Sequence, residues 1–109
     1  MKDFIVVYVT VSTADEGERI ARSLVEERLA ACVNRIAGVR STYRWQGQVE
    51  QSDEELLVIK TSKERFEPMQ ERVRELHSYA VPEIIALPII AGSGAYLQWL
   101  YEQVLPDAK

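Results

Sequence analysis

Two long extended segments between residues 31 and 61 form the most regular hydrophobic pattern of the chain. In the first segment Tyr43 and Trp45 share one parity and polar residues take the other, which is the period-two pattern of a strand with one buried face. The second segment begins polar and ends in the apolar run 56–59, which suits a strand covered on both faces. A two-residue turn at Gln46-Gly47 would join the segments, so the pattern predicts a long hairpin.

The position of this turn fixes which residues of the hairpin face one another. Aromatic side chains and an ion pair would then lie across the strands. Gly38 is expected at a bulge, because a glycine inside a strand often marks an extra residue in the ladder. The cross-strand pairs that the turn predicts are Trp45–Gln48, Tyr43–Glu50 and Arg40–Asp53.

Length is the informative property of the hairpin. An arm of about 14 residues spans roughly 48 Å at about 3.4 Å per residue, whereas a compact chain of this size has a diameter of only about 34 Å. The tip should therefore extend beyond its own domain, where a two-stranded ribbon is marginal in water. Pairing with other copies would complete it, so we predict an obligate homo-oligomer. The alternative is a hairpin that bends over its own sheet at Gly38.

The remaining apolar segments predict two more strands. Residues 3–11 form a nearly continuous β-branched run, which is typical of a central strand buried on both faces. The stretch 83–91 predicts the last strand. Pro88 places that strand at a sheet edge, because a proline cannot donate a hydrogen bond to a neighbouring strand.

Three helices are expected between and after these strands. Thr13 and Glu16 form a capping box that starts the first helix. The second helix follows Ser62 as a candidate cap and becomes regular near Phe66, because Pro68 lacks an amide donor. A short closing helix stops before Pro106. The first helix is expected to bury Ile20, Ala21, Leu24 and Val25, and the second Phe66, Met69, Val73 and Leu76.

The β-α-β-β-α-β order predicts an α+β ferredoxin-like sandwich with a long central hairpin and an extra C-terminal helix. Both crossover helices should cover one face of a four-stranded antiparallel sheet whose first and third strands are central. The other face would expose apolar residues, which is a second argument for partner copies. We expect residues 1–109 to form a single domain.

Composition and charge narrow the classes of partner. Thirteen basic and seventeen acidic residues are interspersed and give a net charge of −4, so nucleic acid is not expected as a partner. No apolar stretch reaches the roughly 18 residues of a membrane span. The single cysteine and an N-terminus without a signal-like apolar core predict a cytoplasmic location.

Candidate chemistry is sparse. No histidine lies near Thr10, Ser12 or Cys32 in the sequence, so no catalytic constellation is visible and we predict a protein that is not an enzyme. A closed metal site needs about four ligands, so one could form only between copies, joining Cys32 to His77 or Glu83 and favouring copper or zinc. The alternatives are that Cys32 is a core residue and that His77 interacts with a helix dipole.

Five stretches together resemble the CutA family of divalent-cation tolerance proteins. The resemblance covers essentially the whole chain. It implies a ferredoxin-like subunit in a homotrimer with long intersubunit hairpins, similar in architecture to the PII signalling proteins. The stretches are residues 29–34, 41–47, 55–61, 77–83 and 96–100.

The resemblance also implies a site. The family pattern places Trp45, Lys60, His77, Tyr79 and Glu83 along an intersubunit cleft, with Cys32 beneath them. Some members carry a cysteine linked to metal near the end of the first strand. Here that position is Val9, which argues against a thiol-based copper site.

We therefore predict a cytoplasmic homotrimer of divalent-cation tolerance, without an obligatory cofactor, that binds copper or another divalent cation weakly through His77. The alternative is a PII-like signalling or scaffold trimer whose cleft binds a small effector or a partner protein. In that alternative Lys60 would supply charge and Trp45 a stacking surface. A hydrolase of the acylphosphatase type is disfavoured, because no arginine-bearing phosphate loop follows the first strand.

Overall fold

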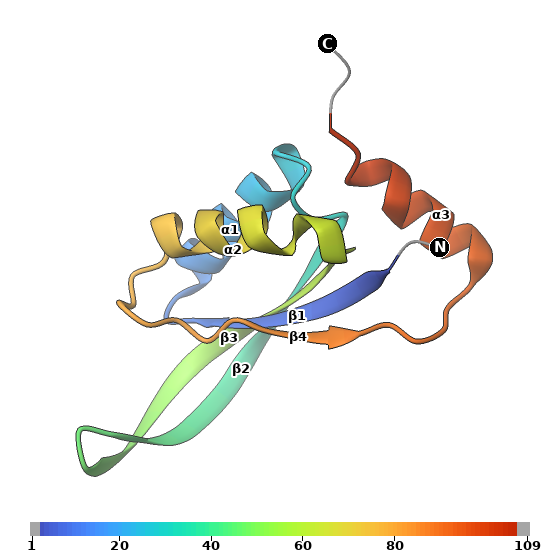
Figure 1. Cartoon of the computed structure of the whole chain (residues 1–109). Helices are drawn as coiled ribbons and strands as arrows, with labels where there is room; N and C mark the ends of the chain where they lie inside the picture. The colour runs from blue at the N-terminus through green and yellow to red at the C-terminus, as the bar shows by residue number, and fades with distance from the viewer. Residues whose placement is uncertain (1–2, 107–109) are drawn as a thin grey trace.

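The computed structural model describes residues 3–106 and consists of one four-stranded antiparallel sheet with helices on one side (Figure 1). The strand order is β2-β3-β1-β4, so the first and third strands are central, as predicted. This confirms the ferredoxin-like α+β fold. The elements are β1 (Phe4–Val11), α1 (Ala14–Glu26), β2 (Cys32–Trp45), β3 (Gln48–Ser62), the 3-10 turn η1 (Lys63–Arg65), α2 (Phe66–Leu76), β4 (Ile85–Pro88) and α3 (Gly94–Gln103).

Alternation along β1 explains the two different faces of the sheet. The odd-numbered residues of β1 are buried under α1 and α2, together with Leu57 and Ile59 of β3, to which Val9 and Val7 are paired. The even-numbered residues point to the opposite face, where Val6 and Tyr8 are only half-buried. We call this opposite side the open face. It leaves apolar side chains partly exposed, as the sequence predicted.

Helix α1 begins as predicted but packs differently. Thr13 caps it, since Thr13 Oγ1 accepts a hydrogen bond from Glu16 N at 3.1 Å. The buried stripe is Gly17, Ile20 and Leu24. The prediction that Val25 is buried is wrong, because Val25 is 44% exposed and faces the groove beside β2.

Gly17 lies where α1 approaches the sheet most closely. A Cβ atom built at this position would overlap Glu55 Oε1 and would lie 3.2 Å from Val11 Cγ2. The Glu55 carboxylate in turn accepts a 2.7 Å hydrogen bond from Arg35 Nε. A glycine is therefore needed for the helix to pack over this ion pair.

Helix α2 becomes regular at Phe66, as predicted, and buries Met69 and Val73. Ser62 precedes η1, but its side chain makes no capping hydrogen bond, so its predicted role as a cap is wrong. The turn η1 takes up the irregular start of the helix. Pro68 then occupies an early helical position, where its missing donor costs little.

The last strand is shorter than the predicted 83–91. Strand β4 pairs with β1 only between Tyr8↔Ile85 and Ile5↔Pro88, and it lies at the sheet edge as predicted. Pro88 cannot donate to a ladder, and beyond it Ile89 N donates a hydrogen bond to Phe4 O at 2.9 Å. The prediction overestimated this strand because apolar residues continue on both sides of the paired segment.

The hairpin confirms the predicted register. Gln46 and Gly47 have positive φ angles of 51° and 79°, and the three predicted cross-strand pairs are all present. Strands β2 and β3 have 14 and 15 residues, and the ribbon extends well past the rest of the sheet instead of bending over it (Figure 1). The molecule measures 46 × 30 × 21 Å.

A bulge at Gly38 decides which side chains of β2 reach the open face. The pairs Ile36↔Leu56 and Val39↔Glu54 leave one extra residue on β2, and Gly38 has a φ of 79°. Even-numbered residues therefore face the open side before the bulge, and odd-numbered residues face it afterwards. Tyr43 and Trp45 lie on the open face for this reason.

Helix α3 packs at one end of the sheet rather than over the open face (Figure 1). Leu100 and Val104 form a small second core with Ala31, against which Phe4 and Leu97 pack. Within residues 3–106, no helix has the length and apolar character needed to cross a membrane.

Candidate functional site

The base of the hairpin holds a cavity of about 660 Å³, which we call the hairpin-base cavity. The hairpin supplies one wall, the end of β1 contributes Thr10, and the segment that follows α2 supplies the opposite wall. A volume of this size lies within the usual range for small-molecule sites. The lining residues are Thr10, Ser41, Thr42, Tyr43, Trp45, Glu54, Tyr79, Ala80, Val81 and Glu83.

Aromatic rings and carboxylates dominate the walls of this cavity. Tyr79 OH donates a 2.7 Å hydrogen bond to Glu54 Oε2. Burial, and then the hydrogen bond to Glu54, raises the pKa of the Tyr79 hydroxyl well above its usual value. Tyr79 therefore stays protonated and holds the Glu54 carboxylate in place. None of the residues that line the cavity is a lysine or an arginine.

A buried carboxylate anchors the segment that carries Tyr79 and Glu83. Glu16 Oε2 accepts a 2.6 Å hydrogen bond from Ser78 N, while Glu16 Oε1 accepts from Ser12 N at 3.1 Å and from Ser12 Oγ at 3.0 Å. Burial raises the pKa of Glu16, but these hydrogen bonds outweigh it and hold the pKa below its usual value. Glu16 thus ties the end of β1, the start of α1 and the cavity wall together.

His77 supports the cavity from beneath and has no free ring nitrogen. Its side chain is fully buried, Nδ1 accepts from Tyr79 N at 3.0 Å, and Nε2 lies 2.8 Å from Thr10 O. These contacts assign the ring proton to Nε2, which donates to the Thr10 carbonyl. The His77 ring also lies against the Tyr79 ring, with centroids 4.7 Å apart. The ring therefore positions the wall and presents no lone pair to a metal.

The structure divides the predicted cleft residues into two groups. Trp45, Tyr79 and Glu83 line the hairpin-base cavity. Lys60 and Cys32 are paired with each other on the sheet, level with Val6 and toward the opposite end of β1 from Thr10. Four residues along a strand span about 13 Å, so one subunit does not bring these groups together.

Lys60 and Cys32 have local partners at their own end of the sheet. The Lys60 ammonium contacts Asn34 Oδ1, and Cys32 Sγ lies 3.9 Å from the same oxygen. Cys32 is half-buried at the start of β2. Both residues point to the open face, so only a neighbouring subunit could bring them to another copy's cavity.

A resident copper site does not fit the residues of a single subunit. Within residues 3–106, no three histidine, cysteine, aspartate or glutamate side chains gather closely enough to hold a metal ion. The imidazole of His77 is already engaged on both sides, and Cys32 lies elsewhere on the sheet. Of the three predicted metal ligands, only Glu83 is exposed to solvent at the cavity.

Sequence analysis missed most residues of the site, and Tyr43, Glu54 and Glu16 are the three with the clearest roles. Tyr43 shares the parity of Trp45, and that signal could have found it. Glu54 could have been placed opposite Val39 from the register that the Gln46-Gly47 turn predicts. Glu16 was recognised as a capping residue, but no local pattern indicates its hydrogen bond to Ser78, which is 62 positions away.

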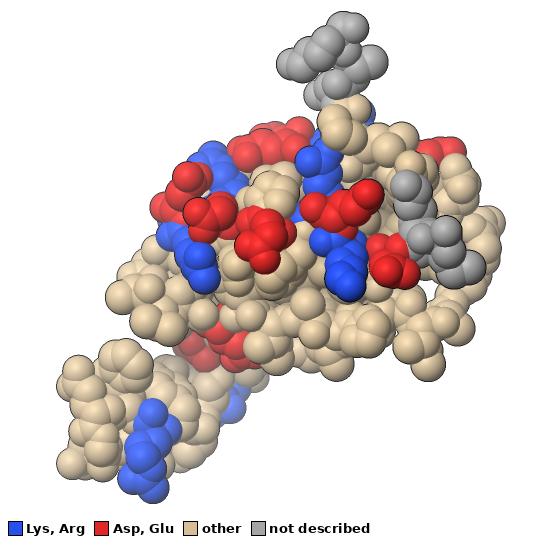
Figure 2. Space-filling model, in the orientation of Figure 1, with Lys and Arg blue, Asp and Glu red and all other residues tan. Residues whose placement is uncertain are grey.

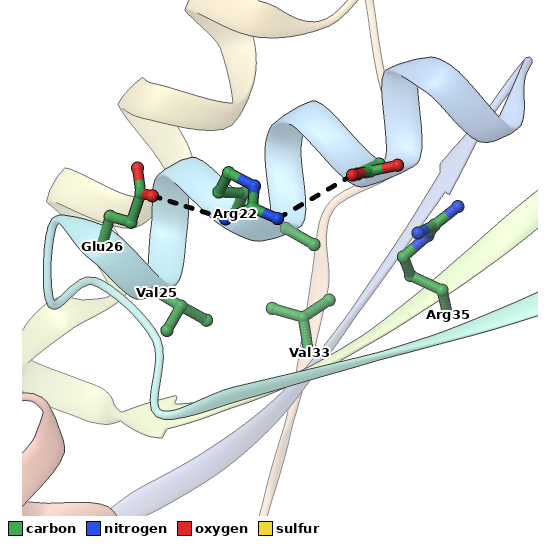
Figure 3. A pocket seen from close by; sticks show the side chains of 7 residues that line it. Arg22, Val25, Glu26, Val33 and Arg35 are labelled. Atoms are coloured by element: carbon green, nitrogen blue, oxygen red, sulfur yellow. Dashed lines mark ion pairs between the residues drawn. The ribbon is translucent and has the colours of Figure 1, made fainter.

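Other surfaces show fewer features of a ligand-binding site than the hairpin-base cavity does. A groove of about 400 Å³ runs between α1 and the start of β2, with Val25 and Val33 beside it (Figure 3). Its central cation, Arg22, already pairs with Glu18 at 3.9 Å and with Glu26 at 3.7 Å. Acidic and basic side chains mix over the helical layer, without a continuous basic patch in the view of Figure 2.

The family model of the CutA1 divalent ion tolerance protein matches residues 5–103 of this chain. The chain belongs to the CutA1 family. A divalent-cation tolerance protein CutA from Thermus thermophilus is 53% identical over 97 residues, covering 89% of this chain and 94% of that protein. A chloroplastic CutA protein from Arabidopsis thaliana is 53% identical over 96 residues and 88% of this chain, which spans only 53% of that longer relative.

Solved CutA1 structures share the fold described above. The cation tolerance protein (Cut A1) of Thermus thermophilus has a TM-score of 0.91 at 51% identity, covering 92% of this chain and 97% of that one. A periplasmic divalent cation tolerance protein CutA from Archaeoglobus fulgidus has a TM-score of 0.89 at 39% identity, covering 96% and 100%. The resemblance drawn from the sequence is confirmed, and the expectation of a non-enzymatic protein agrees with the CutA1 family description.

Proposed function

We propose that this chain acts in divalent-cation tolerance as a cytoplasmic homotrimer. One observation carries the oligomer: from Val39 to Trp45, β2 and its partner β3 form a ribbon of two strands, because β1 pairs with β3 only as far as Glu55. The resulting two-stranded ribbon leaves Trp45 54% and Val49 65% exposed. Such a ribbon is marginal in water, so neighbouring copies are needed to complete its pairing and cover its side chains.

The open face supports the same assembly. It exposes Ile36 to 46%, Ile85 to 51% and Leu87 to 43%, beside the half-buried Val6 and Tyr8. Covering a continuous apolar surface of this kind stabilises an oligomer by the hydrophobic effect. The number of three subunits comes from the PII-like architecture that the family resemblance implies, which is an argument by analogy.

Light scattering tests the trimer. We expect the purified chain to have about three times the mass of one polypeptide, and Leu87→Asp to lower that mass by placing a charge on the open face. Val25→Asp is the matched control, since Val25 is 44% exposed but lies on the helical side. A folded wild-type protein with the mass of one chain would contradict the proposal, as would equal masses for the two variants.

Cation binding in this proposal is weak and does not use His77. Cu²⁺ prefers imidazole and thiolate ligands, but His77 is engaged at both nitrogens and Cys32 is remote from it. The exposed carboxylate of Glu83 is the ligand that remains open. Weak binding through carboxylates suits a protein that meets divalent cations without holding one permanently.

Calorimetric titration with Cu²⁺ checks this assignment. We expect wild type and His77→Gln to bind with affinities within about twofold, and Glu83→Gln to bind less tightly. The titration is made below the unfolding temperature of each variant, so that every sample is folded during the measurement. A tenfold loss in His77→Gln alone would return His77 to the site.

A second candidate function is a PII-like trimer that binds a small effector. The observation that favours it is the hairpin-base cavity, whose volume of about 660 Å³ and aromatic walls suit an organic molecule better than a bare ion. The predicted stacking role of Trp45 fits this cavity. The predicted charge from Lys60 would have to come from a neighbouring subunit.

A further inference from the structure

We propose that His77 and Glu16 form a pH-sensitive latch, in which protonation of His77 releases the backbone of Tyr79 and loosens one wall of the hairpin-base cavity. The latch lies inside one subunit, since the His77 side chain is fully buried and the Glu16 side chain is 6% exposed. It therefore does not depend on which residues of neighbouring copies cover the cavity. The proposal concerns the regulation of this cavity and rests on the proposed function to that extent.

The contacts of His77 fit only a neutral ring. Nε2 donates to Thr10 O at 2.8 Å, and Nδ1 accepts from Tyr79 N at 3.0 Å. A proton added at Nδ1 would set two N–H donors against each other, because a protonated imidazole is a donor at both nitrogens. The hydrogen bond from Tyr79 N is therefore incompatible with the charged ring.

Glu16 is the acceptor that a second ring proton would meet. Its Oε2 atom lies 3.6 Å from His77 Nδ1. The pKa of Glu16 lies below its usual value of 4.5, so this carboxylate is still ionised at the pH at which an imidazole ordinarily gains its charge. Protonation at Nδ1 therefore forms an ion pair with Glu16 and gives up the hydrogen bond from Tyr79 N.

Other ionisable groups lie around this pair. Arg19 of α1 donates to the last carbonyl of α2 at 3.2 Å, but its side chain is exposed, and solvent weakens its repulsion of a charged ring. On the other side, the Tyr79 hydroxyl donates to the carboxylate of Glu54 in β3. The negative charges of Glu16 and Glu54 offset the cost of placing a positive ring in the interior.

Release of the Tyr79 backbone reaches the cavity through the Tyr79 side chain. The Tyr79 ring lies against the His77 ring, its hydroxyl holds Glu54 at 2.7 Å, and both Tyr79 and Glu54 line the cavity. Ser78 N keeps its 2.6 Å hydrogen bond to Glu16 Oε2, since a carboxylate oxygen accepts more than one donor. The latch therefore frees Tyr79 while Ser78 stays anchored.

Nuclear magnetic resonance of the intact oligomer tests the latch. His77 is the only histidine of the chain, so its ring nitrogens give one unambiguous set of signals. Between about pH 7.5 and about pH 5.0, we expect the ring to change from the Nε2–H form to the doubly protonated form. The protection of the Tyr79 amide against hydrogen exchange, corrected for the intrinsic rate, should fall about tenfold over this range, while that of the Ser78 amide stays constant.

Two variants and a matched control assign the response to the latch. His77→Gln supplies an acceptor that does not titrate, so the pH response of the Tyr79 amide should disappear. Glu16→Gln keeps an acceptor for Ser78 N without the charge, and should need about tenfold more protons to reach the same response. Glu18→Gln removes the same charge from an exposed position of α1 and should behave like wild type.

Three results would overturn the proposal. The first is a His77 ring that stays in the Nε2–H form at the lower pH in the folded wild-type protein. The second is an equal loss of protection at Tyr79 and Ser78, which would indicate general loosening of the segment. The third is a pH response of the Tyr79 amide that persists in His77→Gln.

Light scattering at both pH values separates the latch from the proposed function. A trimer whose His77 ring does not titrate removes the latch and leaves the trimer and its role in cation tolerance standing. A single-chain mass removes the trimer. The response of the Tyr79 amide still decides the latch in that case, because all of its atoms lie in one subunit.

Discussion

Glu16→Ala is expected to lower the free energy of unfolding by about 2 to 4 kcal/mol, because three hydrogen bonds to a charged acceptor are lost at once. The Glu16 side chain is only 6% exposed and receives the backbone N–H groups of Ser12 and Ser78. Alanine leaves both donors without their acceptor and releases the cavity wall from α1. Urea denaturation followed by circular dichroism measures the loss.

The control for this substitution is Glu18→Ala in the same helix. Glu18 is exposed, and its Oε2 pairs with Arg22 at 3.9 Å, so its removal should change stability by less than about 0.5 kcal/mol. Similar losses in the two variants would mean that the buried hydrogen bonds of Glu16 contribute little beyond helix propensity.

The same carboxylate should make stability sensitive to acid. The folded-state pKa of Glu16 lies below the usual 4.5, so its contribution is complete above that pH and is lost as pH falls through the lower folded value. Glu16→Gln removes this titration. The stability difference between wild type and Glu16→Gln should therefore shrink as the pH is lowered below 4.5, and a constant difference would contradict the assigned role.

Gly17→Ala is expected to destabilise the protein by about 2 kcal/mol, although alanine is the better helix former by about 1 kcal/mol. The new methyl group would meet the Glu55 carboxylate, which pairs with Arg35 beneath α1. Glu55 must then move and give up this ion pair. The Arg35 side chain is 32% exposed, and this exposure limits the free-energy cost of losing the ion pair.

A double-mutant cycle separates the clash from the helix propensity. In a Glu55→Ala background the carboxylate is absent, so Gly17→Ala should become neutral or stabilising when unfolding free energies are compared. If Gly17→Ala were equally destabilising in both backgrounds, the contact with Glu55 would not be its cause.

Local signals predicted the hairpin well. The Gln46-Gly47 turn and the alternation around Tyr43 and Trp45 are short-range patterns, and they fixed the register, the length of the arms and the central position of β3. The bulge at Gly38 was also foreseeable, since glycine readily takes the positive φ that the extra residue requires.

The features that the sequence did not predict depend on long-range packing. The predicted buried stripe of α1 included Val25, but the observed stripe includes Gly17 instead. Only packing against the strands beneath the helix decides which of these two residues faces the core. The grouping of Lys60 with Trp45 came from family resemblance, and the sheet register separates them within one subunit. The tautomer of His77 depends on its contact with Thr10 O, and Thr10 is 67 positions away in the sequence.

Because one chain alone does not cover its hairpin, folding of the hairpin is completed only when subunits associate. Strands β1 and β3 can pair within one polypeptide, whereas in the proposed trimer the segment from Val39 to Glu54 orders fully only against a neighbour. That last step is second order, so its rate rises with the concentration of newly made protein. At low expression, each newly made subunit would carry a hairpin that no neighbouring copy covers, and this hairpin would be open to proteolysis.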